Sequence, residues 1–186
     1  MRILALSGSL RAESYNTALA RAAGALAPPG VAVDLYDGLR HIPPYDQDRD
    51  EGGSATPRAV VDLRRRIEEA DAVLVVTPEY NGSIPGVLKN AIDWASARHR
   101  GSSFQNKTVA IAGVTTGQYG AIWAQQDLRK VLGISGARVI AGDLPVSRAH
   151  TVFGDAGELV SPLVAERLQA HVASLVAEAV PLAIAV

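Results

Sequence analysis

Short apolar runs and amphipathic stretches alternate along this chain. Apolar or β-branched runs of strand length predict five strands, at Arg2–Leu6, Val31–Leu35, Ala72–Val76, Thr108–Val114 and Ala137–Ala141. Ala-rich stretches and apolar residues at helical spacing predict five helices, at Asn16–Leu26, Val60–Ala70, Ile84–Ala95, Ala121–Leu132 and Val164–Ala179. The sequence therefore predicts a strand followed by a helix, repeated along the whole chain.

The first, third and fourth predicted strands are almost wholly apolar. Such strands are covered on both faces, as in a parallel sheet that lies between two layers of helices. We therefore predict an α/β fold, a three-layer, doubly wound, parallel five-stranded sheet, in a single domain over residues 1–186. Ligands of such sheets bind beyond the carboxyl ends of the strands, which places the candidate chemistry in loops 7–16, 77–83 and 115–120.

Composition narrows the function classes. The chain has 186 residues, with 18 Lys and Arg against 19 Asp and Glu, a formal net charge of -1. This balance argues against a dedicated nucleic-acid binder, which carries a basic excess. The absence of cysteine excludes disulfide scaffolds, thiolate zinc sites, Fe–S clusters and Cys nucleophiles.

The two ends of the chain and one insertion are interpreted from their polarity. The first apolar run meets Ser7 and Gly8 at once, so we interpret it as a strand and not as a secretory signal. The apolar tail 172–186 is interrupted by Glu178 and Pro181 and is shorter than the roughly 20 residues of a membrane span. We therefore expect a cytoplasmic protein with no membrane partner. The segment 37–57, rich in Pro, Gly and Asp, is expected to be a surface loop or lid outside the core.

The first candidate loop reads SGSLRAESYNT from position 7 to 17 and then opens a helix. Free backbone N–H groups at a helix start, with hydroxyl groups nearby, favour an anion, and Arg11 can add a charge-assisted hydrogen bond to a phosphate. The alternative is simple helix capping by Ser14. The motifs of P-loop NTPases, Rossmann dinucleotide sites and hydrolase nucleophile elbows are absent.

The second and third loops are compatible with a planar ligand. In TPEYNGSIP, Pro78 ends a strand, Asn81-Gly82 is a turn dipeptide, and backbone N–H groups beside Tyr80 could face the rim of a heterocycle. The alternative is a capped turn in which Tyr80 covers the end of the sheet. The glycines of TTGQYG allow close approach of a ligand, although a plain β-to-α turn has the same composition.

Other polar residues are interpreted as structural. The four histidines, His41, His99, His150 and His171, lack metal-ligand spacing, so no metal site is predicted. Arg98, His99 and Arg100 are interpreted as a solvated basic face, with recognition of a nicotinamide dinucleotide phosphate as the alternative. Trp94, on a predicted helix, is interpreted as a core or interface residue.

The segments GSLRAESYN, PEYNGSIPGVLKNAIDWAS and TTGQYG, in this order, resemble the NADPH-dependent FMN reductase family, which includes chromate, quinone and azo-dye reductases. The resemblance runs from about Arg2 to Ile140 and implies a flavodoxin-like fold, bound FMN, and NADPH or NADH as co-substrate. It implies an FMN phosphate held by Ser9, Arg11, Ser14, Tyr15 and Asn16. It places the isoalloxazine along Pro78, Glu79, Tyr80 and Asn81, with Gly82 and Ser83 nearby and Thr115, Thr116 and Gly117 beside the ring.

The expected activity is ping-pong hydride transfer from NAD(P)H to a small-molecule flavin, quinone, azo or chromate-type acceptor. The cofactor supplies the redox chemistry, so no catalytic side chain is predicted. The resemblance also implies a homodimer or homotetramer, with the helix Ile84–Ala97 near the subunit contact. The alternatives are an FMN-bearing electron carrier or redox sensor that acts through a protein partner, and a scaffold without a ligand whose loops are only turns.

Overall fold

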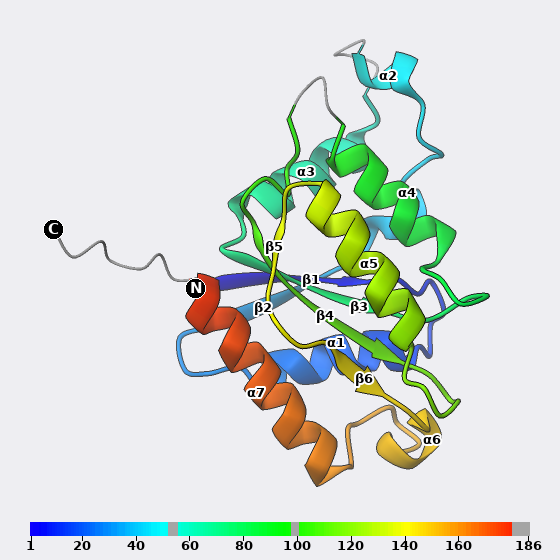
Figure 1. Ribbon diagram of the computed structural model, residues 1–186, viewed down its shortest axis with the longest axis vertical. Helices are drawn as coiled ribbons and strands as arrows, with labels where there is room; N and C mark the ends of the chain where they lie inside the picture. The colour runs from blue at the N-terminus through cyan, green and yellow to red at the C-terminus, as the bar shows by residue number, and fades with distance from the viewer. Residues whose placement is uncertain (52–55, 98–100, 180–186) are drawn as a thin grey trace, which may run out of the picture.

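The computed structural model describes residues 1–51, 56–97 and 101–179 (Figure 1). The strands are β1 (Arg2–Ser7), β2 (Ala32–Tyr36), β3 (Ala72–Thr77), β4 (Thr108–Val114), β5 (Arg138–Val139) and β6 (Leu144–Val146). The helices are α1 (Tyr15–Ala25), α2 (Gln47–Glu51), α3 (Arg58–Glu69), α4 (Gly86–Ala95), α5 (Ile122–Ile134), α6 (Ala149–Val152) and α7 (Pro162–Ala179), with a 3₁₀ turn η1 (Gly38–His41). Each predicted strand and helix has a counterpart in this list.

The strands form one parallel sheet in the order β2-β1-β3-β4-β5. The chain moves from β1 to β2 on one side and then to β3 on the other, so the order reverses between β1 and β3. The predicted doubly wound parallel sheet is thereby confirmed. Reversal points of this kind open a crevice at the carboxyl ends of the two strands, where ligands of open α/β sheets bind.

The fifth position of the sheet differs from the prediction. One strand was expected over 137–141, but two short strands share this position, and both pair with β4. Strand β5 pairs with the start of β4, and β6 pairs with its last three residues. The interruption contains Gly142 in the left-handed region (φ 77), a conformation that leaves the extended path of a strand. The second segment brings residues 147–149 to the carboxyl edge of the sheet.

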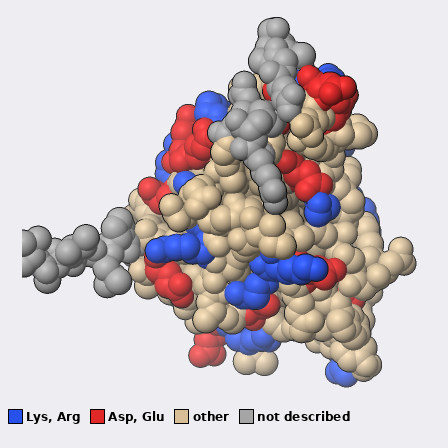
Figure 2. All heavy atoms as spheres, turned by 45° about the horizontal axis from the view of Figure 1, so that its top comes forward, with Lys and Arg blue, Asp and Glu red and all other residues tan. Residues whose placement is uncertain are grey.

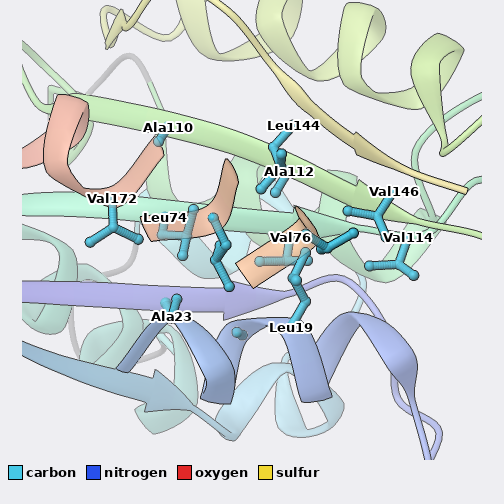
Figure 3. Packing of buried hydrophobic residues seen from close by; sticks show 14 of the residues in the cluster. Leu19, Ala23, Leu74, Val76, Ala110, Ala112, Val114, Leu144, Val146 and Val172 are labelled. Atoms are coloured by element: carbon cyan, nitrogen blue, oxygen red, sulfur yellow. The ribbon is translucent and has the colours of Figure 1, made fainter. Parts of the chain in front are cut away.

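Alternate side chains of the sheet enter two separate cores. On one face, Leu74, Val76 and their neighbours pack against α1 and α7, which lie on the same side in Figure 1. Figure 3 shows Leu19 and Ala23 of α1 pointing at this face. On the other face, Val73 and its neighbours pack against α3, α4 and α5. Because the central strands are buried on both faces, their continuous apolar sequences are explained.

The segment 37–57 belongs partly to the core, so its expected exclusion from the core was wrong. Leu39 and Ile42 are buried in the cluster beneath α3 and α4. The carbonyl of Pro43 accepts hydrogen bonds from Trp94 Nε1 and Asn90 Nδ2, both at 2.8 Å. Isolated apolar residues among prolines and carboxylates have no periodicity, and the partners that bury them lie far away in the sequence. Residues 52–55 lie outside the described part.

Charges are mixed on the surface. Figure 2 shows Lys and Arg beside Asp and Glu on the face it presents, without a large field of one sign.

Trp94 is fully buried, as predicted. Within the described residues no helix is both long and apolar enough to cross a membrane. The basic cluster at 98–100 and the end of the apolar tail, 180–186, lie outside the described residues.

Candidate functional site

The three predicted loops follow β1, β3 and β4, which are neighbours in the sheet. In parallel strands all carboxyl ends lie on one edge, so the loops meet beside the β1–β3 reversal point. The register supports this: Ser7 of β1 pairs with Val76 of β3, and Thr77 pairs with Gly113 of β4. The backbone N–H of Gly8 then donates to the Val76 carbonyl at 2.8 Å, which continues the ladder into the first loop.

The first loop presents unused hydrogen-bond donors. Ser14 caps α1, and its Oγ accepts from the Thr17 N–H at 3.4 Å, as the capping interpretation predicted. Between Ser9 and Asn16, the only backbone N–H with an acceptor in the described part of the chain is that of Arg11, which donates to Ser9 Oγ at 3.4 Å. The exposed Arg11 side chain has no ion pair among the described residues. Donors without acceptors at a helix start suit a phosphate.

Arg11, Ser14 and Tyr15 also line one end of an open groove of about 980 Å³. The groove runs along α1 and is bounded on its other side by the segment 153–159. The phosphate loop is therefore accessible from solvent. The Tyr15 ring stacks on Phe153 with centroids 5.4 Å apart, so its aromatic face is already used inside the protein.

Asn16 has a different environment from that of an exposed phosphate ligand. Its side chain is buried: Oδ1 accepts from the Val114 N–H at 2.9 Å, and Nδ2 donates to the Val114 carbonyl at 3.1 Å. Both polar atoms of the amide are therefore engaged by the last residue of β4. The side chain fixes the start of α1 to the end of β4, and its backbone N–H remains the group that is free to meet a ligand.

The second loop is a tight turn linked to α5. Asn81 and Gly82 have φ of 53° and 76°, and Tyr80 and Ser83 exchange backbone hydrogen bonds of 3.0 and 3.1 Å. The N–H of Tyr80 is therefore used, while those of Glu79, Asn81 and Gly82 have no acceptor in the described structure. The N–H groups on either side of Tyr80 are thus available to a ligand, as the sequence led us to expect, whereas that of Tyr80 itself is not.

Glu79 performs a task that the sequence did not indicate. Its Oε2 accepts from the N–H groups of Trp123 and Ala124, at 3.0 and 3.1 Å, at the start of α5. The residue that precedes this helix, Ala121, supplies no side-chain cap. A carboxylate at a helix N-terminus also interacts favourably with the helix dipole. Together with the 2.7 Å bond from Ser83 Oγ to Asp127 Oδ2, Glu79 fastens the second loop to α5.

The third loop is held by hydrogen bonds with β6, with the segment after it, and with the side chain of a residue on α5. The Thr115 N–H donates to the Val146 carbonyl at 3.0 Å, and the Arg148 N–H donates to the Gly117 carbonyl at 2.9 Å. Gln125 is fully buried, and its Nε2 donates to the Gly120 carbonyl at 2.7 Å. Thr116 and Gly117 remain exposed at the rim.

The predicted residues thus occupy one edge of the sheet, but they differ in availability. By contrast with the rest, some have donors or exposed backbone: Ser9, Arg11, Asn81, Gly82, Thr116 and Gly117. Pro78 is buried, and the side chains of Asn16 and Glu79 have partners inside the protein. Reasoning from the sequence missed Gln125 and the segment after β6. A buried glutamine on an amphipathic helix is one signal that could have found the first.

This arrangement fits a mononucleotide. A dianionic phosphate matches the free donors and Arg11 at α1, and a flat ring system matches the two short loops next to the reversal point. The residues present therefore suit FMN. Fold and site together define a flavodoxin-like, mononucleotide-binding protein.

Comparisons with known proteins identify the family. Residues 1–151 match the family described as NADPH-dependent FMN reductase. The chain is 39% identical over 176 residues to an NAD(P)H-dependent FMN reductase of Pseudomonas aeruginosa, an alignment that covers 94% of this chain and 93% of that protein. It is 39% identical over 142 residues to a quinone reductase of Escherichia coli, with 75% and 73% covered. The chain belongs to the NADPH-dependent FMN reductase family, and its enzyme class and cofactors, FMN and NAD(P)H, follow from that membership.

Solved structures agree on the fold. FerB of Paracoccus denitrificans, described as a flavoenzyme NAD(P)H:(acceptor) oxidoreductase, superposes with a TM-score of 0.86 at 31% identity, and 96% of each chain is covered. Flavodoxin 1 of Bacillus cereus superposes with a TM-score of 0.62 at 13% identity, with 95% of this chain and 98% of that chain covered. At this identity the second likeness speaks for the fold alone, and it confirms the flavodoxin-like prediction.

Proposed function

We propose that the protein binds FMN at the carboxyl edge of its sheet and uses NAD(P)H to reduce small planar acceptors of the quinone type. The observation that carries the proposal is the first loop, where unpaired backbone donors and a free Arg11 lie at the start of α1, next to the β1–β3 reversal point. The names of the relatives, quinone reductase and NAD(P)H-dependent FMN reductase, support the same chemistry.

FMN held at this edge would supply the two-electron redox chemistry between NAD(P)H and the acceptor. The overall change balances: NAD(P)H supplies the hydride, one proton comes from solvent, and a quinone becomes a hydroquinone. The residues of this chain bind and orient. Arg11 and the donors of residues 9–16 would hold the phosphate, and the free N–H groups of Asn81, Gly82 and Thr116 would face the polar rim of the ring.

Glu79 and Gln125 would act as positioning residues. Glu79 fixes the second loop to α5, and Gln125 fixes the Gly120 carbonyl of the third loop. The two loops that would border the ring are thereby held by partners outside the loops. Preorganised donors of this kind need no rearrangement when negative charge develops on a ligand.

The test is the absorption spectrum of the purified protein, followed by anaerobic addition of NADPH or NADH in a stopped-flow instrument. We expect a yellow preparation, or one that becomes yellow with FMN, whose flavin bleaches rapidly with the nicotinamide alone and recovers when a quinone is added. A flavin that bleaches only with a separate reductase would instead indicate an electron carrier. A colourless protein that leaves the fluorescence of added FMN unchanged would refute the proposal.

The remaining assignments belong to the same proposal. We infer a single domain that works in the cytoplasm as a homodimer or homotetramer, with α4 near the subunit contact. The apolar residues exposed on its surface, among them Ile134 beside α4 in the groove with Lys89, are compatible with such a contact. Light scattering on the FMN-loaded protein would give the oligomeric state.

A further inference from the structure

Three large aromatic side chains are exposed at the rim of the candidate site. The exposed fractions of Tyr80, Tyr119 and Trp123 are 51%, 55% and 46%. Tyr80 lies in the second loop, Tyr119 in the third, and Trp123 in the first turn of α5. Exposed aromatic rings gathered at one place leave a free-energy gain available to a ligand that covers them.

Two of these rings pack against each other, and the backbone under one of them is tied to the second loop. The Tyr119 and Trp123 rings have centroids 4.9 Å apart at an interplanar angle of 57°, so they form a tilted pair. The Trp123 N–H donates to the carboxylate of Glu79, the residue directly before Tyr80. The pair is therefore fastened to the same loop that, in the proposed function, borders the flavin ring. A rigid aromatic surface loses little conformational entropy when a ligand covers it.

The chemistry of the pair indicates its ligand. Neither ring carries a charge, and the nearby carboxylates of Glu79 and Asp127 already have hydrogen-bond partners. An uncharged, conjugated, planar molecule gains aromatic contact there, whereas an oxyanion such as chromate finds no cation on either ring. We propose that Tyr119 and Trp123 form an aromatic platform that binds planar aromatic acceptors and makes the enzyme selective for them over small anionic oxidants. This inference rests on the proposed function.

Binding can be measured without turnover. The chain has two tryptophans, and Trp94 is fully buried, so quenching of the exposed tryptophan fluorescence reports on Trp123. In the absence of NADPH, we expect 1,4-naphthoquinone to quench Trp123 in the FMN-loaded protein. Equilibrium dialysis then gives its Kd in each variant. Replacing both rings, Tyr119→Leu with Trp123→Leu, should raise the Kd about tenfold, whereas Trp123→Phe, which keeps a ring, should raise it about twofold or less.

Kinetics test selectivity. In the double variant, kcat/KM for 1,4-naphthoquinone should fall about tenfold, while kcat/KM for ferricyanide, which has no aromatic ring, should change less than about twofold. The rate of flavin bleaching at saturating NADPH, measured without acceptor, shows separately whether the double variant still takes up hydride. Leu163→Ala, on α7 and exposed on another element, is the matched control for loss of surface apolar area.

The possible results separate the platform from its rivals. An unchanged naphthoquinone Kd in the double variant would overturn the proposal, as would an equal loss for naphthoquinone and ferricyanide. A change of oligomeric mass in the double variant, seen by light scattering, would overturn it too, because the rings would then be an interface between copies of the chain. If the wild type binds naphthoquinone through Trp123 but never oxidises NADPH, the proposed function fails while the platform stands.

Discussion

At the scale of single residues, the site is organised by side chains whose polar atoms point inward. Asn16 uses its amide on the backbone of Val114, and Glu79 uses its carboxylate on the start of α5. Each joins two segments that approach only in the folded protein. Their removal would therefore act on the framework of the site before it acts on any ligand, and the two effects can be separated by measuring stability without FMN.

Asn16→Ala should destabilise the protein even without a flavin. The substitution leaves the N–H and carbonyl of Val114 buried without partners, and we expect a loss of about 2 kcal/mol in the free energy of unfolding. Asn16→Asp should also destabilise the protein. The bond from the Val114 N–H would remain, but a carboxylate oxygen would replace the donor that now faces the Val114 carbonyl. Urea unfolding of the apoprotein checks both. Equal stability of Asn16→Ala and wild type would show that the bridge to Val114 contributes nothing.

At the scale of elements, the sequence predicted the repeated part of the fold and missed the parts that depend on distant partners. The apolar runs of β1, β3 and β4 and the stripe of α4 were sufficient to predict these elements. By contrast, the partner of Asn16 lies 98 residues away, and the role of Glu79 depends on where α5 starts. No local pattern contains such information, which explains why the sequence predicted that the three loops meet at one edge of the sheet but not the partners of their side chains.

The insertion gives a prediction at this scale. Asp50 of α2 is fully buried and forms two bonds, of 2.8 and 2.7 Å, with Arg64 of α3, which also donates to the Trp94 carbonyl. Asp50→Ala would leave a buried guanidinium without its carboxylate, at a cost of about 3 kcal/mol. The double variant Asp50→Ala with Arg64→Met should lose less than the sum of the single variants.

Asp34→Ala is the matched control for Asp50→Ala. Asp34 pairs with Arg2 on the surface, where both side chains are about half exposed, so its removal should change the stability by no more than about 0.5 kcal/mol. Urea unfolding of the wild type, both single variants, the double variant and the control measures these differences. If the loss in Asp50→Ala is as small as in the control, the ion pair does not fix the insertion to α3.

Helix α7 provides a pH-dependent contribution. Burial against the sheet lowers the pKa of His171 below its usual 6.5, partly offset by a hydrogen bond with the backbone of Ile111 and by the charge of Asp143, while Arg129 and Arg167 add to the lowering. The Nε2 atom of His171 is buried without a hydrogen-bond partner among the described residues.

The sign follows from proton binding. The unfolded chain takes up the His171 proton at a higher pH than the folded protein, so stability falls as the pH drops below about 6.5. The slope from one group cannot exceed about 1.4 kcal/mol per pH unit. His171→Leu should remove this part of the slope, whereas His150→Gln, at an exposed position, should keep it. Urea unfolding at several pH values gives the slope of the free energy of unfolding against pH for each protein. An identical slope in wild type and His171→Leu would contradict the prediction.

At the scale of the whole molecule, the proposed ligand site and the fold are thermodynamically linked. The site is made of loops from three neighbouring strands, and α1 and α5 begin there. A ligand that contacts all of these loops can therefore bind only to the folded protein. A ligand that binds the native state alone stabilises the whole fold. The gain depends on the ligand concentration relative to its Kd, which turns stability into a measure of each contact.

FMN should therefore raise the free energy of unfolding of the apoprotein. Part of this gain should depend on Arg11. At 100 times its Kd, FMN should add about 2.7 kcal/mol, or roughly 5 to 10 °C in Tm for a chain of this size. Arg11→Ala removes the cation of the phosphate loop, which has no ion pair among the described residues. If its affinity for FMN falls about tenfold, the gain at the same FMN concentration shrinks to about 1.4 kcal/mol. Thermal unfolding with and without FMN measures this.

Arg21→Ala is the control for Arg11, because Arg21 also lies on the α1 side of the groove but outside the phosphate loop. Its FMN-induced gain should equal that of the wild type. Riboflavin, which has the same ring without the phosphate, should stabilise wild type and Arg11→Ala alike, and less than FMN stabilises the wild type. If riboflavin and FMN stabilise the wild type equally, the anion does not bind at the start of α1, and the donors of residues 9–16 have another purpose.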